Sequence, residues 1–223
     1  MRIFLVAILS VFILFFLGCG HTDEKFISQG TIEYDASAVD QENPMASMAP
    51  SKMIVKFKNN NSCAEMSAGM GLFTTSFVCN SQTNSLTQLV KLLNKKFALV
   101  LNAGELKKEN DEYGIEVIPT SETKVIAGYK CLKAHIKSKD KSCSDFDVFY
   151  TQDLDLQNPN FANPFYMIGG VLMEYQLKKF GIEMKFTAKS IKKENIDDSI
   201  FDLPMDYKKV SKNEMDTFLK GLQ

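Results

Sequence analysis

The sequence predicts an α+β fold in which a curved antiparallel β-sheet, shaped as a half-barrel, has helices packed on its concave face. Two observations support this prediction. Segments with the alternation or the β-rich composition of strands recur between residues 29 and 193. Two other segments, 83–97 and 211–222, space their apolar residues as amphipathic helices do. An antiparallel sheet commonly buries one face under helices and leaves the other free, so these elements fit one domain over residues 29–223.

The first half of the domain opens on strands. The stretch "QGTIEYDASA" (29–38) alternates as a strand does, and "KMIVKFKN" (52–59) is predicted to be a second strand. Residues 39–51 between them contain two prolines and small residues, which indicates a loop. The stretch "SCAEMSAGMGLFTTSFVCN" (62–80) is predicted to be a hairpin that turns at its glycines.

The middle of the domain is predicted to be helical. In "TNSLTQLVKLLNKKF" (83–97), apolar residues recur at i, i+3, i+4, i+7 and i+11 from Leu86, which is the spacing of one helix face. Residues 97–102 then indicate a strand or the buried end of that helix. The charged stretch "ELKKENDEY" (105–113) is predicted to be a solvated turn.

The second half is predicted to be strands up to a final helix. Residues 114–151 are mostly strand, and residues 157–170 are irregular, with two prolines and paired glycines. Residues 171–193 are predicted to be a hairpin. The C-terminal helix begins with a capping box, in which Ser211 is the N-cap and Glu214 lies three residues on.

The N-terminus has the pattern of an export signal. Residues 3–16 form an apolar block that is shorter than the roughly 20 residues of a membrane span. Small residues follow it, as in a cleaved signal, and "FLGC" resembles the lipobox of bacterial lipoproteins. We expect residues 1–18 to be a lipoprotein signal peptide, Cys19 to carry the lipid anchor, including palmitate, and residues 19–28 to be a tether. An uncleaved N-terminal anchor is the alternative.

The remaining four cysteines form an even set, which in an exported protein indicates disulfide bonds. If the hairpin turn centres on its second glycine, Cys63 and Cys79 lie directly opposite each other, with Cβ atoms about 4.5–5.5 Å apart. We therefore expect a Cys63–Cys79 disulfide and, by elimination, a Cys131–Cys143 disulfide. A Cys₄ zinc site is the competing hypothesis, but zinc ligands usually come in closer pairs than these.

The composition argues against several classes of function. Net charge is −1, so no basic field attracts nucleic acid. Arg2 is the single arginine and lies in the predicted signal, which disfavours bidentate recognition of phosphate. Histidine occurs only at His21 and His135. We therefore expect no catalytic constellation, no metal site and no cofactor, and we predict a protein that is not an enzyme.

Some polar residues are weaker candidates for a site. His135 could be a base or a ligand, but Lys133 and Lys137 share its strand face, which indicates solvent. Asp145 and Asp147 alternate along a strand and could pair as acid and base only with a partner strand that the sequence does not identify.

The stretch "DLDLQNPN" (153–160) spaces Asp153, Asp155, Asn158 and Asn160 in the manner of calcium ligands. It lacks the glycine and the closing glutamate of an EF-hand loop, so we interpret it as a turn.

The methionines of the loop and first hairpin form a further group, namely Met45, Met48, Met53, Met66 and Met70. Thioethers suit Cu(I), and methionine also lines adaptable apolar grooves or fills an ordinary core. All three readings stay open at this point.

Two stretches carry a family resemblance. The strand "TKVIAGYKCLKAHI" (123–136) and the later "SIFDLPMDYKKVS" (199–211) resemble secreted proteins of the GLPGLI type and a related family of unknown function, many of them lipoproteins. "GTIEY" (30–34) is similar to their opening strand. These families are similar in architecture to the LolA/LolB lipoprotein carriers. The resemblance implies a curved sheet and an envelope location, and it implies no catalytic residues.

The sequence thus predicts a membrane-anchored lipoprotein of the bacterial cell envelope, at the outer membrane on its periplasmic or surface face. Its expected role is non-enzymatic binding of an apolar ligand, such as a lipid or acyl chain, in the groove of the half-barrel. The alternative is a structural module of the envelope that docks a partner protein. Neither hypothesis involves nucleic acid.

Overall fold

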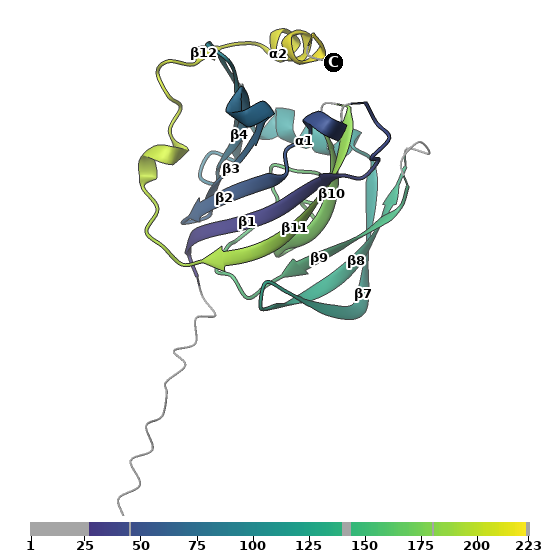
Figure 1. Cartoon of the computed structure of the whole chain (residues 1–223). Helices are drawn as coiled ribbons and strands as arrows, with labels where there is room; N and C mark the ends of the chain where they lie inside the picture. Colours follow the sequence, from purple (N-terminus) through teal and green to yellow (C-terminus); the bar gives the residue numbers. More distant parts are fainter. Residues whose placement is uncertain (1–26, 45, 140–143, 180, 222–223) are drawn as a thin grey trace, which may run out of the picture.

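The computed structural model describes residues 27–44, 46–139, 144–179 and 181–221, and within them twelve strands form a single sheet (Figure 1). The order across the sheet is β12-β6-β5-β4-β3-β2-β1-β11-β10-β9-β8-β7. The strands are β1 (Gln29–Ala38), β2 (Lys52–Lys58), β3 (Asn61–Ala68), β4 (Phe73–Asn80), β5 (Ser85–Leu92), β6 (Lys95–Leu101), β7 (Ile115–Ile126), β8 (Tyr129–Ser138), β9 (Phe146–Thr151), β10 (Val171–Lys179), β11 (Ile182–Lys192) and β12 (Lys208–Lys209).

Helices form a small part of the described chain. They are α1 (Ala103–Glu112), α2 (Lys212–Lys220) and the short 3₁₀ helices η1 (Ala46–Met48), η2 (Gly69–Gly71) and η3 (Asp198–Phe201). Strands are paired antiparallel throughout the described sheet except for β12, which runs parallel to β6.

The predicted fold class is wrong. The described chain is mostly β, with one open sheet whose edge strands are β12 and β7. It is not an α+β half-barrel with helices packed over a concave face, because the two helices α1 and α2 pack mainly at the β4–β6 end of one large sheet. The strand predictions for 29–38, 52–59, 62–80 and 171–193 are confirmed.

The largest error concerns residues 83–97, which form strands β5 and β6 and the turn between them rather than a helix. Leu86 and Val90 lie on one face of β5, whereas Leu89 lies on the other face and is also buried. A strand that is covered on both faces loses its apolar-polar alternation. In this stretch, the two apolar faces together mimic the i, i+3, i+4 spacing of a helix.

The residues predicted to be a charged turn, 105–113, are instead mainly helix α1. Its side chains are largely solvated, and only Leu106 and Asn110 are buried, so the sequence shows no broad apolar face. The overlooked signal is a capping box, because Asn102 and Glu105 cap one another's backbone N–H groups. The predicted C-terminal helix is confirmed, with the same box formed by Ser211 and Glu214.

The segment after β11 passes around one edge of the sheet (Figure 1). It first crosses the outer face, where Phe201, Leu203 and Tyr207 pack on buried residues of β4, β5 and β6. It then pairs with β6 as β12 and turns into α2. Met215 and Leu219 of α2 pack on the opposite face of the same strands. This segment therefore covers β5 and β6 on both sides.

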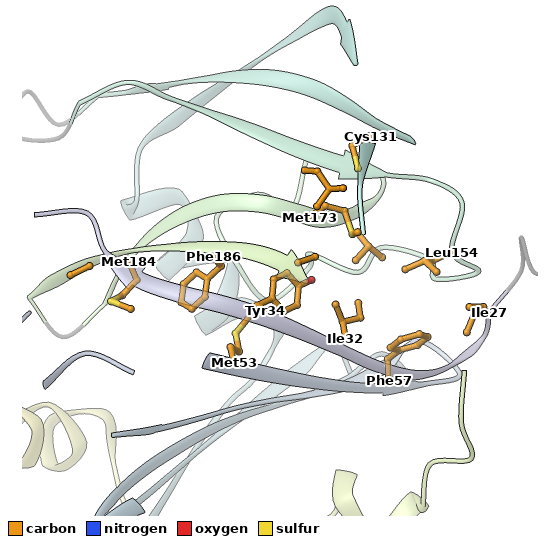
Figure 2. Packing of buried hydrophobic residues seen from close by; sticks show 14 residues of the cluster. Ile27, Ile32, Tyr34, Met53, Phe57, Cys131, Leu154, Met173, Met184 and Phe186 are labelled. Carbon is orange, nitrogen blue, oxygen red and sulfur yellow. The ribbon is translucent and has the colours of Figure 1, made fainter. Parts of the chain in front are cut away.

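The main core cluster lies where β1, β2, β10 and β11 share a face. Figure 2 shows Tyr34 in the middle of this cluster, between Phe186 and Ile32. The Tyr34 hydroxyl donates a hydrogen bond to the carbonyl of Leu172 at 2.8 Å, so its one polar atom is satisfied inside the core. The inner face of the sheet beside this cluster borders the candidate site.

Candidate functional site

A cavity of about 920 Å³ lies against the inner face of the sheet. Ligand pockets typically span about 300–1,000 Å³, so the cavity has the size of a small-molecule or lipid site. Its wall is built by side chains of β1 to β6, β10 and β11. Helices α1 and α2 and residues 156–164 border it elsewhere.

The alternation of the strands makes this wall apolar. Successive side chains of a strand point to opposite faces, so Met53, Val55 and Phe57 of β2 reach the cavity together. On β4 the same rule brings Phe73 and Phe77 to the wall. The strands that border the cavity contribute no charged side chain among the described lining residues.

Several wall residues are only half-buried although they lie on the inside of the sheet. Met66, Phe73 and Phe77 retain accessible surface, and all three line the cavity. In a close-packed core such side chains would be almost inaccessible. The inner face between β3 and β5 therefore presents apolar surface that the protein's own atoms leave uncovered.

Helix α1 is tied to the other elements that border the cavity. The Asn110 side chain donates a hydrogen bond to the carbonyl of Phe161 at 3.1 Å, which joins α1 to the 156–164 segment. Lys212 of α2 forms an ion pair with Glu109 of α1 at 2.6 Å. The charged residues that line the cavity lie on these two helices, namely Glu109, Glu112, Lys212, Asp216 and Lys220.

Hydrogen bonds inside residues 156–170 also stabilise this part of the cavity border. Asn160 is buried, and its amide nitrogen donates to the carbonyls of Ile168 and Gly170, each at 2.8 Å. Asn160 therefore joins the two ends of the 156–170 segment through these hydrogen bonds. Within the described residues, no three His, Cys, Asp or Glu side chains gather as a metal site would require.

The predicted cysteine register is wrong by one residue. In the β3–β4 hairpin, Cys79 lies opposite Ser62, and Cys63 lies opposite Val78. The two cysteines therefore point to opposite faces, and no disulfide joins them. Cys79 lines the cavity and Cys63 packs on the outer face. Burial raises the pKa of each thiol to about 11.

The second expected disulfide rests partly on residues outside the described ranges. Cys131 on β8 is buried, and its thiol donates a weak hydrogen bond to the carbonyl of Tyr129 at 3.4 Å. Burial raises the pKa of the Cys131 thiol. Cys143 and the predicted lipid anchor Cys19 lie outside the described residues, as does the predicted signal peptide, so these expectations stay predictions.

His135 has a cross-strand partner that the sequence did not identify. Its Nδ1 atom lies 2.9 Å from a carboxylate oxygen of Asp147 on β9, and Lys133 lies 3.0 Å from the other oxygen. The hydrogen bond with His135, followed by that with Lys133, holds the pKa of Asp147 below its ordinary value. None of these residues lines the cavity. His135 and Asp147 are 37% and 40% exposed, so the group forms an ion network at the surface.

The methionines do not form one cluster. Met53 and Met66 are directly opposed on β2 and β3 and both line the cavity, whereas Met70 is fully exposed at the tip of the β3–β4 hairpin. Met45 lies outside the described residues. Met53 and Met66 lie among the apolar residues that line the cavity, which favours the hypothesis of an apolar groove over that of a copper site.

Glu174 on β10 illustrates how the outer face is stabilised. Its carboxylate lies 2.8 Å from Lys124 and 3.1 Å from Lys185, and its side chain is 12% exposed. Burial acts to raise the pKa of this carboxyl, but the hydrogen bonds from Lys124 and Lys185 outweigh burial, so the pKa of Glu174 lies below its ordinary value.

We expect Glu174→Gln to lower the free energy of unfolding at pH 7 and to flatten its dependence on pH. A carboxyl whose pKa is lowered on folding stabilises the protein above its unfolded pKa, about 4.3, and this stabilisation is lost as pH falls through the folded pKa. Urea unfolding from pH 7 to pH 3 measures it. Glu116→Gln, at an exposed position of β7, is the control, and equal profiles for both variants would contradict the expectation.

Residues 27–221, apart from positions 45, 140–143 and 180, contain no helix with the length and apolar character needed to cross a bilayer. A scan against protein-family models and a search of curated proteins find no match to this chain.

Proposed function

We propose that this protein binds an apolar, lipid-sized ligand in the cavity on the inner face of its sheet and has a carrier or receptor role rather than an enzymatic one. The observation that supports this proposal is a cavity of about 920 Å³ whose strand wall is mostly apolar and carries no charged side chain among the described lining residues. Burial of a ligand's apolar surface is favourable by roughly 25 cal/mol per Å². The accessible surfaces of Met66, Phe73 and Phe77 would be buried against such a ligand.

The two cysteines of the β3–β4 hairpin offer a direct test. Cys79 lines the cavity and Cys63 lies on the opposite face of the sheet, while both thiols have a pKa of about 11. We expect a bound apolar molecule to slow alkylation of Cys79 by N-ethylmaleimide severalfold, because it blocks access from within. Alkylation of Cys63 should not change.

The measurement follows alkylation at each site by peptide mass spectrometry, with and without N-phenyl-1-naphthylamine as the apolar probe. Cys63 is the internal control, since it reports any general tightening of the fold. Equal protection of both cysteines, or protection of neither, would contradict binding in this cavity.

We also propose that Cys19 is acylated and holds the protein at the cell envelope, on the basis of the "FLGC" pattern. Each buried CH₂ contributes about 0.8 kcal/mol to membrane binding, and more than one acyl chain makes such anchoring stable. We expect cells fed an alkyne analogue of palmitate to label the wild-type protein and not the Cys19→Ser variant. Labelling that persists in the Cys19→Ser variant would contradict acylation at Cys19. Membership in the GLPGLI-like group likewise stays a prediction.

A second candidate function is docking of a partner protein. It is favoured by exposed apolar side chains at two adjacent turns, since Met70, Leu72 and Leu93 are all exposed and the Leu93 amide donates to the carbonyl of Leu72 at 2.9 Å. Exposed apolar patches often mark interaction sites. Unchanged alkylation of Cys79 in the presence of the probe would favour this alternative.

A further inference from the structure

Two buried polar groups interrupt the apolar wall of the cavity. Thr75 on β4 is 3% exposed and Gln88 on β5 is 8% exposed, and both line the cavity. The Thr75 hydroxyl and the Gln88 amide nitrogen have no hydrogen-bond partner within the described structure. Leaving a buried polar group unpaired destabilises the fold, so each of these groups needs an explanation.

The two groups lie close together. Thr75 pairs with Val90 and Phe77 pairs with Gln88 in the β4–β5 ladder, so Thr75 and Gln88 are diagonal neighbours on the same face. Diagonal neighbours in an antiparallel pair are about 7–8 Å apart at Cα. Both polar atoms are covered in the ligand-free structure. Once each side chain turns its donor toward the cavity, one ligand oxygen placed between them could accept from both.

The charge around this pair limits what the ligand can be. Lysines reach the cavity only on α2, at Lys212 and Lys220 among the described lining residues, and Lys212 is already paired with Glu109. A carboxylate or phosphate at Thr75 and Gln88 would be buried without a cation, which is costly. An uncharged carbonyl oxygen needs only the two donors that are present.

We infer that the ligand is an acyl ester or amide whose uncharged carbonyl oxygen accepts hydrogen bonds from Gln88 and Thr75, while its hydrocarbon chain contacts the apolar wall. This inference rests on the proposed function and specifies the class of ligand. Binding then satisfies the two polar groups that the ligand-free cavity leaves unpaired. The two donors would also favour an ester over a free fatty acid with the same chain, because the ionised acid would bring a charge into this site.

The test is competition against N-phenyl-1-naphthylamine on the full-length protein, freed of bound lipid and checked by native mass spectrometry. The competitors are methyl laurate, laurate at pH 8 and tridecane. We expect methyl laurate to compete roughly tenfold more strongly than either of the others, as one or two net hydrogen bonds would give. Equal competition by the ester and the alkane, or stronger competition by laurate, would overturn the inference.

Two nearly isosteric variants assign the effect to these residues. Thr75→Val and Gln88→Leu should each reduce the advantage of the ester severalfold, leave tridecane unchanged and raise the melting temperature of the ligand-free protein. Thr87→Val, on the outer face of β5, is the matched control and should leave the order of competitors unchanged. Full ester preference in both variants, or a lower melting temperature in both, would count against the inference. Absence of probe binding in the wild type would instead remove the proposed function itself.

Discussion

The Ala64→Trp variant is expected to lose binding of an apolar probe by about a hundredfold, equivalent to about 2.7 kcal/mol. Ala64 on β3 lines the cavity and lies between Val55 of β2 and Phe77 of β4, which also line it. An indole at this position would fill the space that we assign to the ligand. Because that space is open, the cost to the fold should be smaller than the 1–3 kcal/mol of overpacking a full core.

Binding of N-phenyl-1-naphthylamine, followed by its fluorescence, measures the effect. Glu65→Trp is the matched control, because Glu65 is the next residue on β3, is exposed and points to the other face. It adds the same side chain without entering the cavity and should leave the affinity unchanged. An Ala64→Trp protein that binds the probe like the wild type would show that the probe binds elsewhere.

The Phe165→Ala variant is expected to lose about 3–5 kcal/mol of unfolding free energy, the usual cost of deleting a buried phenylalanine ring. Phe165 is fully buried and packs with Ile136 and Val148. Its ring meets those of Phe146 and Tyr175 edge to face, at 6.2 and 5.9 Å between centroids. Such aromatic pairs add about 0.5–1.5 kcal/mol each beyond area burial.

Urea unfolding of the two proteins gives this difference. Tyr166→Ala is the control, since Tyr166 is the next residue, is 47% exposed and makes one hydrogen bond, to Asp111 at 3.1 Å. It should cost less than about 1 kcal/mol. Because residues 156–164 border the cavity, Phe165→Ala should also weaken probe binding. Similar losses in the two variants would mean that Phe165 does not anchor this segment.

Local patterns in the sequence were sufficient where one face of a strand is buried and the other is solvated. The alternation of residues 29–38 predicts β1 correctly, and the capping box at Ser211 predicts the start of α2. They were misleading at residues 83–97, because the Phe201–Tyr207 segment covers the outer face of β5. That cover comes from more than one hundred residues further along the chain, so no local window contains it.

The cysteine error has a different cause. The register of a hairpin depends on the backbone of its turn, and a shift of one residue moves a side chain to the other face. Gly69, Met70 and Gly71 all adopt positive φ angles, and this turn sets Cys63 against Val78 rather than against Cys79. A count from the centre of the turn could not reveal that conformation.

The sequence could predict the apolar character of the candidate site but not its volume or its polar residues. Apolar strand faces and inner methionines are visible in the sequence, and they support an apolar groove. The volume of the cavity depends on how closely α1, α2 and the 156–164 segment approach the sheet, which is a property of packing. The roles of Thr75 and Gln88 were missed because each lies beside other polar residues of its strand, in "FTTSFVCN" and "SLTQLVKL". Nothing in these stretches marks which of the polar residues faces the inside of the sheet.

The pairing of β1 with β11 has a consequence for biosynthesis. Thr31 lies opposite Lys192, so the second partner of β1 is translated long after β1 itself. Strands β1 to β6 are consecutive neighbours and can assemble early, but the nascent chain then exposes the free edge of β1. Unpaired edges invite intermolecular association, and distant pairings slow folding. We therefore expect a chaperone that protects the β1 edge until β11 arrives to improve the yield of native protein.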